Sequence, residues 1–209
     1  MSMRIYTMTH KKFTPLPDPL YVPLHVGRAC GENLGYLGDD TGEQISALNC
    51  YYSELTGFYW IWKNCHDADY VGTCHYRRYL INEKEQIYTE KEYRELLRKY
   101  DLVTTKKVLL NNSYYDGFLA NHNIRALEMT GKVITEKYPE YADAFEQLVN
   151  GRQTYFGNIL VTSKILFDEY ASWLFSIFFE VAERIELETG EDAYHKRVFG
   201  FISERSEER

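Results

Sequence analysis

The stretch "DADYVGTCHYRRYL" (residues 67–80) contains a short apolar segment followed at once by a histidine, two arginines and two tyrosines. Residues 70–74 have the composition of a buried β-strand. In sheets with parallel strands, ligands gather at the carboxyl ends of the strands. We therefore expect a binding site at residues 75–78. If the chain stays extended there, alternation sends His75 and Arg77 to one face and Tyr76 and Arg78 to the other.

Strands and helices alternate on both sides of this stretch. Strands are expected at 3–10, 101–105 and 157–162, and a proline-rich extended loop at 15–23. Helical periodicity, with capping-box patterns at Thr41 and Thr89, predicts helices at 41–64, 89–100, 123–138, 140–149, 163–187 and 191–205. The chain is 209 residues long, which suits a single domain, residues 1–209. The order predicts an α/β layered fold with a small mixed, mainly parallel sheet flanked by helices, and a helical C-terminal half.

Charge and composition narrow the function. The net charge of −7 argues against a nucleic-acid binder that relies on a broad basic surface, so any positive site must be local. Aromatic residues make up 16% of the chain, including nineteen tyrosines. Tyrosine suits a sugar or a nucleobase as ligand, although most of these side chains are expected to fill half-buried positions.

Neither disulfides nor a membrane span is predicted. Four widely spaced cysteines follow a start without a signal peptide, which favours reduced thiols in the cytosol. The most apolar run, residues 170–179, is shorter than the about 20 residues that span a bilayer. Trp173, Phe175, Phe178 and Phe179 form an apolar helix face that could touch lipid, but a core-facing helix is the simpler explanation.

The arginines have two interpretations. The planar guanidinium fork matches phosphate oxygens, so Arg77 and Arg78 beside tyrosine and histidine suit a nucleotide diphosphate. Alternatively, they pair with Asp67 or Asp69 and only brace a loop. A zinc site at Cys74-His75 is disfavoured, because adjacent strand residues point to opposite faces.

Other polar residues are less specific. His10 follows the first strand, where a ligand could be met, whereas His122 could simply cap a helix. Asp39 and Asp40 precede the helix at 41–64, and N-capping is expected of one of them. Glu191 and Asp192 could supply a general base or only stabilise a helix N-terminus.

Several ordered blocks of the chain resemble the bacterial family DUF4422. They are "YTMTHKKF", "GYLGDDTGEQIS", "YYSELTGFYWIWKN", "DADYVGTCHYRRYL", "GNILVTSKILFDEYASWLF" and "RVFGFISER". The family occurs in gene clusters for capsular and exopolysaccharide synthesis. Its members are regarded as glycosyltransferases, some linked to galactofuranose transfer.

The resemblance implies a GT-A-like fold with a UDP-linked nucleotide-sugar donor and a glycan or lipid-linked glycan acceptor. The nucleotide-sugar side would be about 1–110 and the helical acceptor side about 111–209. The expected location is the cytoplasm, at the inner face of the membrane, with peripheral membrane contact left open and no nucleic-acid partner. A non-catalytic carbohydrate- or nucleotide-binding module is the alternative.

The resemblance also suggests site residues. GT-A enzymes hold a divalent metal, Mn or Mg, with an Asp-x-Asp element, yet no such element stands at the matching position, 75–78. Either the arginines neutralise the diphosphate directly, or Asp67 and Asp69 take part, so the metal stays open. Asp192 is expected to be the catalytic base. The expected substrate-binding residues are Thr9, His10, Lys11, Asp40, His75, Tyr76, Arg77, Arg78, His122 and Arg197.

Overall fold

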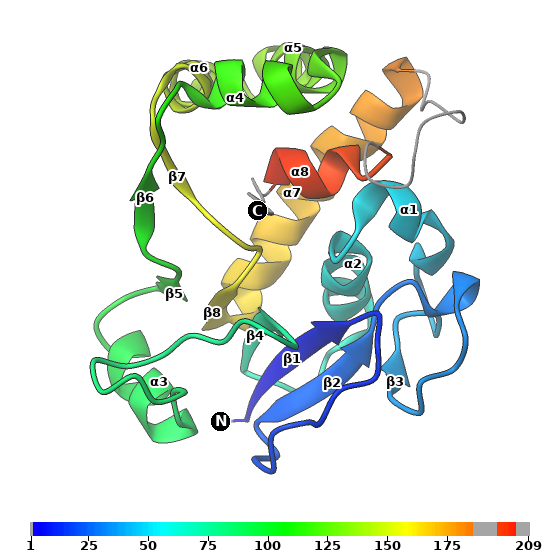
Figure 1. Cartoon of the computed structure of the whole chain (residues 1–209), viewed down its shortest axis with the longest axis vertical. Helices are drawn as coiled ribbons and strands as arrows, with labels where there is room; N and C mark the ends of the chain where they lie inside the picture. Colours follow the sequence, from blue (N-terminus) through cyan, green and yellow to red (C-terminus); the bar gives the residue numbers. More distant parts are fainter. Residues whose placement is uncertain (1, 186–195, 204–209) are drawn as a thin grey trace.

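A computed structural model describes residues 2–185 and 196–203 (Figure 1). Its main sheet has six strands in the order β3-β2-β1-β4-β8-β5. The strands are β1 (Met3–Thr9), β2 (Tyr21–His25), β3 (Leu37–Gly38), β4 (Tyr70–His75), β5 (Leu102–Thr104) and β8 (Leu160–Ser163). The first four neighbours in the sheet are parallel, and β8 runs antiparallel to β4 and β5. The predicted α/β fold with a mixed, mainly parallel sheet is confirmed.

Strand β1 is buried on both faces. Tyr6 and Met8 point into the larger apolar cluster, whereas Met3 and Ile5 point into a smaller one on the other face. Period-two alternation separates these pairs. Because both faces are apolar, the strand lacks the alternation of polar and apolar residues that marks a half-exposed strand.

Helices cover the two faces of the sheet. On one face, α2 (Leu55–Asn64) and α7 (Lys164–Arg184) pack together, with Phe58 stacked on Phe167 at 5.5 Å between ring centroids. On the other, α3 (Glu90–Leu97) buries Tyr93. Its predicted capping box is present, since Thr89 and Glu92 exchange side-chain and backbone hydrogen bonds. Phe175 and Phe178 of α7 are buried, so its apolar face is a core face.

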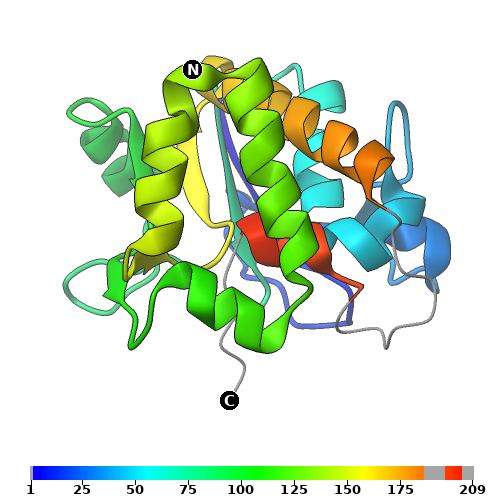
Figure 2. The same ribbon diagram turned by 90° about the horizontal axis from the view of Figure 1, so that it is seen from above.

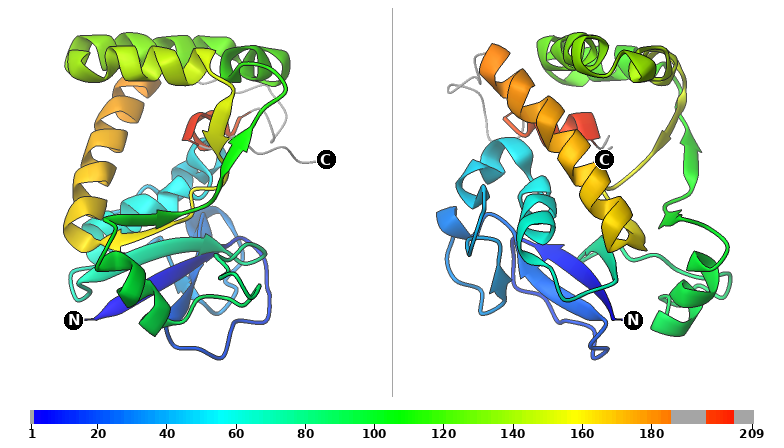
Figure 3. Two further views of the ribbon diagram at one scale, coloured as in Figure 1. Left: turned by 90° about the vertical axis from the view of Figure 1, so that its left-hand side faces the viewer. Right: turned by 180° about the vertical axis from the view of Figure 1, so that it is seen from behind.

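A further helical layer lies away from β1 and β2 (Figures 2 and 3). It consists of α4 (Tyr114–Asn121), α5 (Ile124–Lys137), η3 (Pro139–Tyr141) and α6 (Ala142–Asn150). The ribbon of β6 (Lys107–Leu109) and β7 (Gln153–Tyr155) joins this layer to the sheet. The short helix α8 (Val198–Ser203) lies between the layer and α1 (Asn49–Tyr52) (Figure 1). No helix in the described ranges has the length and apolarity needed to cross a bilayer.

The prediction of a loop throughout 15–23 was wrong at its end, where β2 begins. Pro23 was the reason for expecting a loop, because proline lacks the N–H that a sheet uses. The backbone N–H of Val26 donates to the carbonyl of Thr9 in β1. Backbone N–H groups point to alternate sides along a strand, so the nitrogen of Pro23 faces away from β1. On that side β3 pairs with β2 only from Leu24 onward. No described strand therefore pairs with β2 at the position where Pro23 lacks an N–H group on that side.

The prediction of one helix from 41 to 64 was also wrong. The chain forms η2 (Ser46–Leu48) and α1, breaks at Ser53 with φ of 51°, and resumes as α2. Thr41 does not start a helix; its hydroxyl accepts a hydrogen bond from the indole N–H of Trp60 at 3.0 Å. The ends of the helices predicted at 163–187 and 191–205 lie partly outside the described residues.

Asp39 does not cap the helix that follows it. Its carboxylate is fully buried and accepts from the backbone N–H groups of Gly27 (2.9 Å) and Arg28 (3.2 Å). It also accepts from the hydroxyls of Ser46 and Thr56. Asp39 thus ties η1 (Arg28–Cys30), which follows β2, to η2 and α2.

We expect Asp39→Asn to lower the free energy of unfolding by about 2–4 kcal/mol, because an amide cannot accept from all four donors and leaves buried groups unpaired. Urea unfolding measures the loss. The matched control is Asp40→Asn, which removes only a partly exposed contact with Arg28 at 3.5 Å and should cost less than about 1 kcal/mol. Equal losses in the two variants would contradict this role of Asp39.

Candidate functional site

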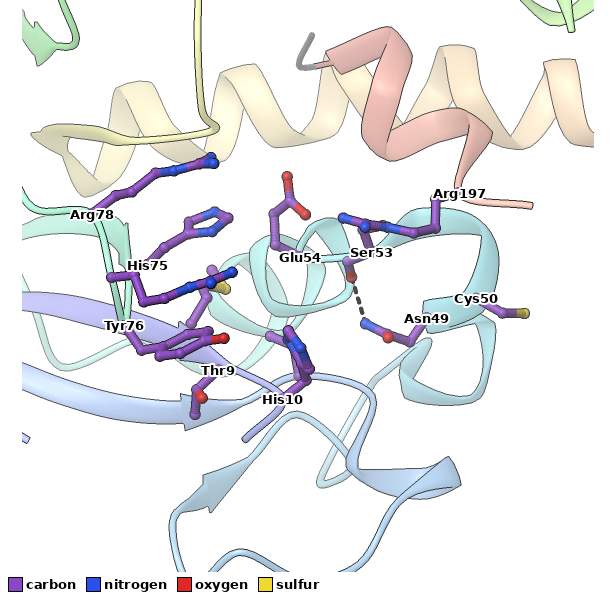
Figure 4. A pocket seen from close by; sticks show the side chains of 13 residues that line it. Thr9, His10, Asn49, Cys50, Ser53, Glu54, His75, Tyr76, Arg78 and Arg197 are labelled. Atoms are coloured by element: carbon purple, nitrogen blue, oxygen red, sulfur yellow. Dashed lines mark hydrogen bonds between the residues drawn. The ribbon is translucent and has the colours of Figure 1, made fainter. Parts of the chain in front are cut away.

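A cavity of about 370 Å³ lies at the carboxyl ends of β1 and β4 (Figure 4). From β1 the chain continues to β2 on one side, whereas β4 lies on the other, so this is a switch point of the sheet. The volume falls in the range of about 300–1,000 Å³ that is usual for ligand pockets. The lining residues are Met8, Thr9, His10, Val26, Asn49, Cys50, Ser53, Glu54, His75, Tyr76, Arg77, Arg78 and Arg197.

A tight turn shapes one wall of the cavity. The backbone N–H of His75 donates to the carbonyl of Arg78 at 3.1 Å, and that of Arg78 donates to the carbonyl of His75 at 2.9 Å. The chain therefore does not stay extended after β4, and the alternation expected for 75–78 does not hold. Because of the turn, all four side chains from His75 to Arg78 line the same cavity.

The two arginines lie on the surface of this turn. Within the described ranges Arg77 forms no ion pair, and its guanidinium lies 5.0 Å from the ring centroid of Tyr76. Asp67 pairs instead with Arg4 at 2.6 Å, near the start of β4. Asp69, also before β4, accepts from the backbone N–H of Ser2 at 2.6 Å. These aspartates lie at the opposite end of the strand from the cavity.

Arg197 enters the cavity from the segment before α8. Its Nε donates to the hydroxyl of Ser53 at 2.8 Å, and its guanidinium lies 5.4 Å from the ring centroid of Phe201. Gly200 lets α8 approach Ser53 closely, because a Cβ at position 200 would lie only 2.8 Å from Ser53 Oγ. A side chain from a segment distant in sequence, Arg197, thus contacts the break between α1 and α2.

The sequence did not suggest Glu54, the carboxylate that lines the cavity among the described residues. It is 6% exposed and accepts a hydrogen bond from Asn158 Nδ2 at 2.7 Å. The continuous helical periodicity of 45–62 concealed the break beside it. The order Ser53-Glu54-Leu55, a serine followed by an acid at the start of an apolar run, is nevertheless a helix-start pattern and could have revealed it. Asn49, Cys50 and Ser53 were missed for the same reason.

Arginines outnumber carboxylates in the described lining of the cavity. Partial burial lowers the pKa of His10, and the charges of Lys11, Arg197 and Arg77 lower it further. Burial also lowers the pKa of His75; the carboxylate of Glu54 partly opposes this, while Arg78, Arg197 and Arg77 add to it. The pKa values of two histidines, one just after β1 and one at the end of β4, are therefore lowered further by the same two arginines, Arg77 and Arg197. In this acidic chain the cationic side chains are gathered locally, as was expected of any positive site.

The structure brings together Thr9, His10, His75, Tyr76, Arg77, Arg78 and Arg197 of the expected site residues. Lys11 is exposed outside the lining, although its charge reaches His10. Asp40 lies near Arg28 in the loop after β3. His122 stacks on Phe201 at 4.1 Å and so supports α8 rather than lining the cavity. Asp192 lies outside the described residues.

The described lining does not fit a divalent metal of the Mn or Mg kind. Such ions prefer several carboxylate oxygens, and the described lining offers one carboxylate among arginines. No cluster of three or more potential metal-ligating His, Cys, Asp or Glu residues occurs within 2–185 and 196–203. Cys74 faces the core beside Thr7 at 3.3 Å, and burial raises the pKa of its thiol to about 12. Cys74 does not line the cavity that His75 lines, so the two side chains are not placed to share an ion.

Comparison with known proteins identifies the family of the chain. The family described as "Domain of unknown function (DUF4422)" matches residues 4–207. The chain belongs to this family. A search of curated proteins found no match.

A solved structure adds to this. The chain is similar to the structure described as the WbbM bifunctional glycosyltransferase in its apo form, with 33% identity and a TM-score of 0.87. The match covers 97% of this chain and 41% of that one. This DUF4422 chain therefore corresponds to less than half of the larger protein.

We expect the protein to lose stability as the pH falls below about 6.5. His10, His25 and His75 have pKa values below the usual 6.5, mainly through burial, so the unfolded chain binds their protons first. The contribution of these histidines to folding stability is fully present above their pKa in the unfolded chain. It is lost as the pH falls through their lower pKa values in the folded protein. Urea midpoints at pH 7.5 and 5.5 measure this.

His75→Gln should reduce the difference between the two midpoints, because one of the three groups no longer titrates. Glu92, whose pKa is lowered to about 2, changes the folding stability only at pH values below those compared here. Equal midpoints at both pH values would contradict the prediction.

Proposed function

We propose that the protein is a glycosyltransferase that moves a sugar from a UDP-sugar to a glycan or lipid-linked glycan acceptor during polysaccharide synthesis. The observation that carries this is the turn at 75–78, which directs two arginines into a cavity at the sheet's switch point. Membership of DUF4422 and the likeness to a bifunctional glycosyltransferase support it. UDP-galactofuranose is the donor to test first. The proposed location is the cytoplasmic side of the membrane.

In the proposed reaction the arginines bind the diphosphate. Arg77, Arg78 and Arg197 bring permanent charge and planar donor groups to one cavity, and such groups match phosphate oxygens. Negative charge grows on the departing phosphate as the sugar leaves. Preorganised donors in a partly enclosed site stabilise that charge more than water does.

Tyr76 is the proposed contact for the nucleobase. Its ring lines the cavity and is held by His10 and Phe13, each 5.8 Å away between ring centroids. An aromatic face held in this way suits a flat base. The nucleotide would then lie over the end of β1, with the diphosphate toward the arginine turn.

The division into a nucleotide-sugar side (about 1–110) and an acceptor side (about 111–209) is part of the proposal. Arg197 and Asn158 support it, because both belong to the second half and reach the cavity or its buried carboxylate. An acceptor approaching between the halves would meet the sugar at the centre of the cavity.

We expect Arg77→Ala to weaken UDP binding about 10- to 100-fold, since losing one charge-assisted contact costs about 1.5–3 kcal/mol. Isothermal titration with UDP measures the affinity, and a thermal-shift panel of UDP-sugars, with and without Mn²⁺, identifies the donor. The matched control is Arg98→Ala, an exposed arginine at the end of α3 outside the cavity, which should leave UDP binding unchanged.

The assay that separates an enzyme from a binding module is the release of UDP from the donors in the panel. Binding of UDP-sugars without turnover, across donors and acceptors, would favour the non-catalytic module. Wild-type protein that does not bind UDP, or an Arg77→Ala variant that binds it normally, would contradict the proposed site.

A further inference from the structure

The buried carboxylate of Glu54 lies in a cavity that otherwise collects positive charge. In Figure 4 its side chain points into the cavity from the start of α2, with Arg78 on one side and Arg197 on the other. We propose that Glu54 is the catalytic base that removes the proton from the acceptor hydroxyl. This inference rests on the proposed glycosyltransferase function.

The fold fixes the position of this carboxylate. Glu54 follows Ser53, whose positive φ of 51° ends α1 and turns the chain so that residue 54 starts α2 at the cavity wall. A non-glycine residue in this backbone region is uncommon and costs energy that the surrounding structure must offset. The hydrogen bond from Arg197 to the hydroxyl of Ser53 contributes to holding the break.

Asn158 orients the side chain from the opposite half of the chain. Its amide donates to Glu54 Oε1 at 2.7 Å and to the hydroxyl of Ser203 at 3.0 Å. Asn158 is itself buried, and its carbonyl accepts from Thr73 in β4 at 2.7 Å. The carboxylate is therefore connected to the central strand and to α8, so Asn158 is a positioning residue.

The carboxylate lies at a helix N-terminus, in a cavity that three arginines also line. The N-terminus of a helix stabilises negative charge, and residue 54 is the N-cap of α2. Glu54 and His75 line the same cavity, and Figure 4 shows both side chains at its wall. A glutamine side chain could accept the same hydrogen bond from Asn158, so Glu54→Gln removes the charge while this contact can remain.

The proposed step is a single displacement. The acceptor's O–H bond breaks and its proton moves to the Glu54 carboxylate, while the acceptor oxygen forms a bond to the anomeric carbon of the donor sugar. The bond from that carbon to the diphosphate oxygen breaks, and its electron pair leaves with UDP near the arginines. The anomeric configuration is inverted, because attack and departure occur on opposite faces of the sugar.

The test compares Glu54→Gln with wild type. The assays are UDP binding by isothermal titration and UDP release from the most active donor of the UDP-sugar panel, with octyl galactosides as acceptors. We expect Glu54→Gln to bind UDP within about threefold of wild type and to melt near the wild-type temperature. UDP release should fall about 10²- to 10⁴-fold, the usual contribution of general base catalysis.

Two further variants separate a base from a structural group. Formate added to Glu54→Ala should restore part of the release, because a small carboxylate replaces the missing one. Asn158→Ala should lower the rate less than Glu54→Gln does. Asp192→Asn is made in parallel, since that residue is the base expected from the sequence.

Each outcome bears on the inference. Glu54→Gln with wild-type turnover overturns it and leaves the proposed function intact; loss of turnover in Asp192→Asn alone does the same. Retention of configuration, or a Glu54→Gln variant that no longer binds UDP, also overturns it. Wild-type protein without UDP binding or release contradicts the proposed function itself and the inference with it.

Discussion

The parallel pairing of β1 with β4 is the constraint on which the rest of the structure depends. Their register sets Met8 opposite His75, so both strands end at the same level of the sheet. Beyond this level, the backbone N–H of Tyr76 donates to the carbonyl of Met8 at 3.1 Å and anchors the turn at 75–78. Because β1 continues to β2 on one side while β4 lies on the other, the connections diverge and leave a hollow.

The interrupted helix supplies the second wall of this hollow. A single straight helix would turn only one of its faces to the sheet and would not direct the backbone of residues 53 and 54 into the cavity. The interruption is stabilised by long-range contacts: Asp39 binds Thr56 in α2, Arg197 binds Ser53, and Gly200 lets α8 approach. Tyr52, just before the interruption, stacks on Phe199 of α8 at 4.5 Å.

The charges that line the cavity contrast with the net charge of the protein. The net charge is −7, yet three arginines from two distant segments line one site, and both histidines there are held toward the neutral form. Glu54 lies among these groups and is compensated by them. In the proposed sugar transfer, the arginines would stabilise the leaving diphosphate and the carboxylate would accept the proton of the incoming hydroxyl. The interrupted helix and the turn place these groups in one cavity.

The sequence by itself determined the features that depend on local pattern. The capping box at Thr89, the strand at 70–74, which the structure extends to His75, and the family blocks could all be recognised, because each involves residues close together in the chain. It also indicated the end of β4 as a candidate site, and the cavity lies there. Only the tertiary structure decided that β2 passes through Pro23, that the chain turns at 76–77, and that Glu54 and Arg197 share a cavity. These depend on contacts between segments up to 144 residues apart, such as Arg197 with Ser53, and no local periodicity encodes such contacts.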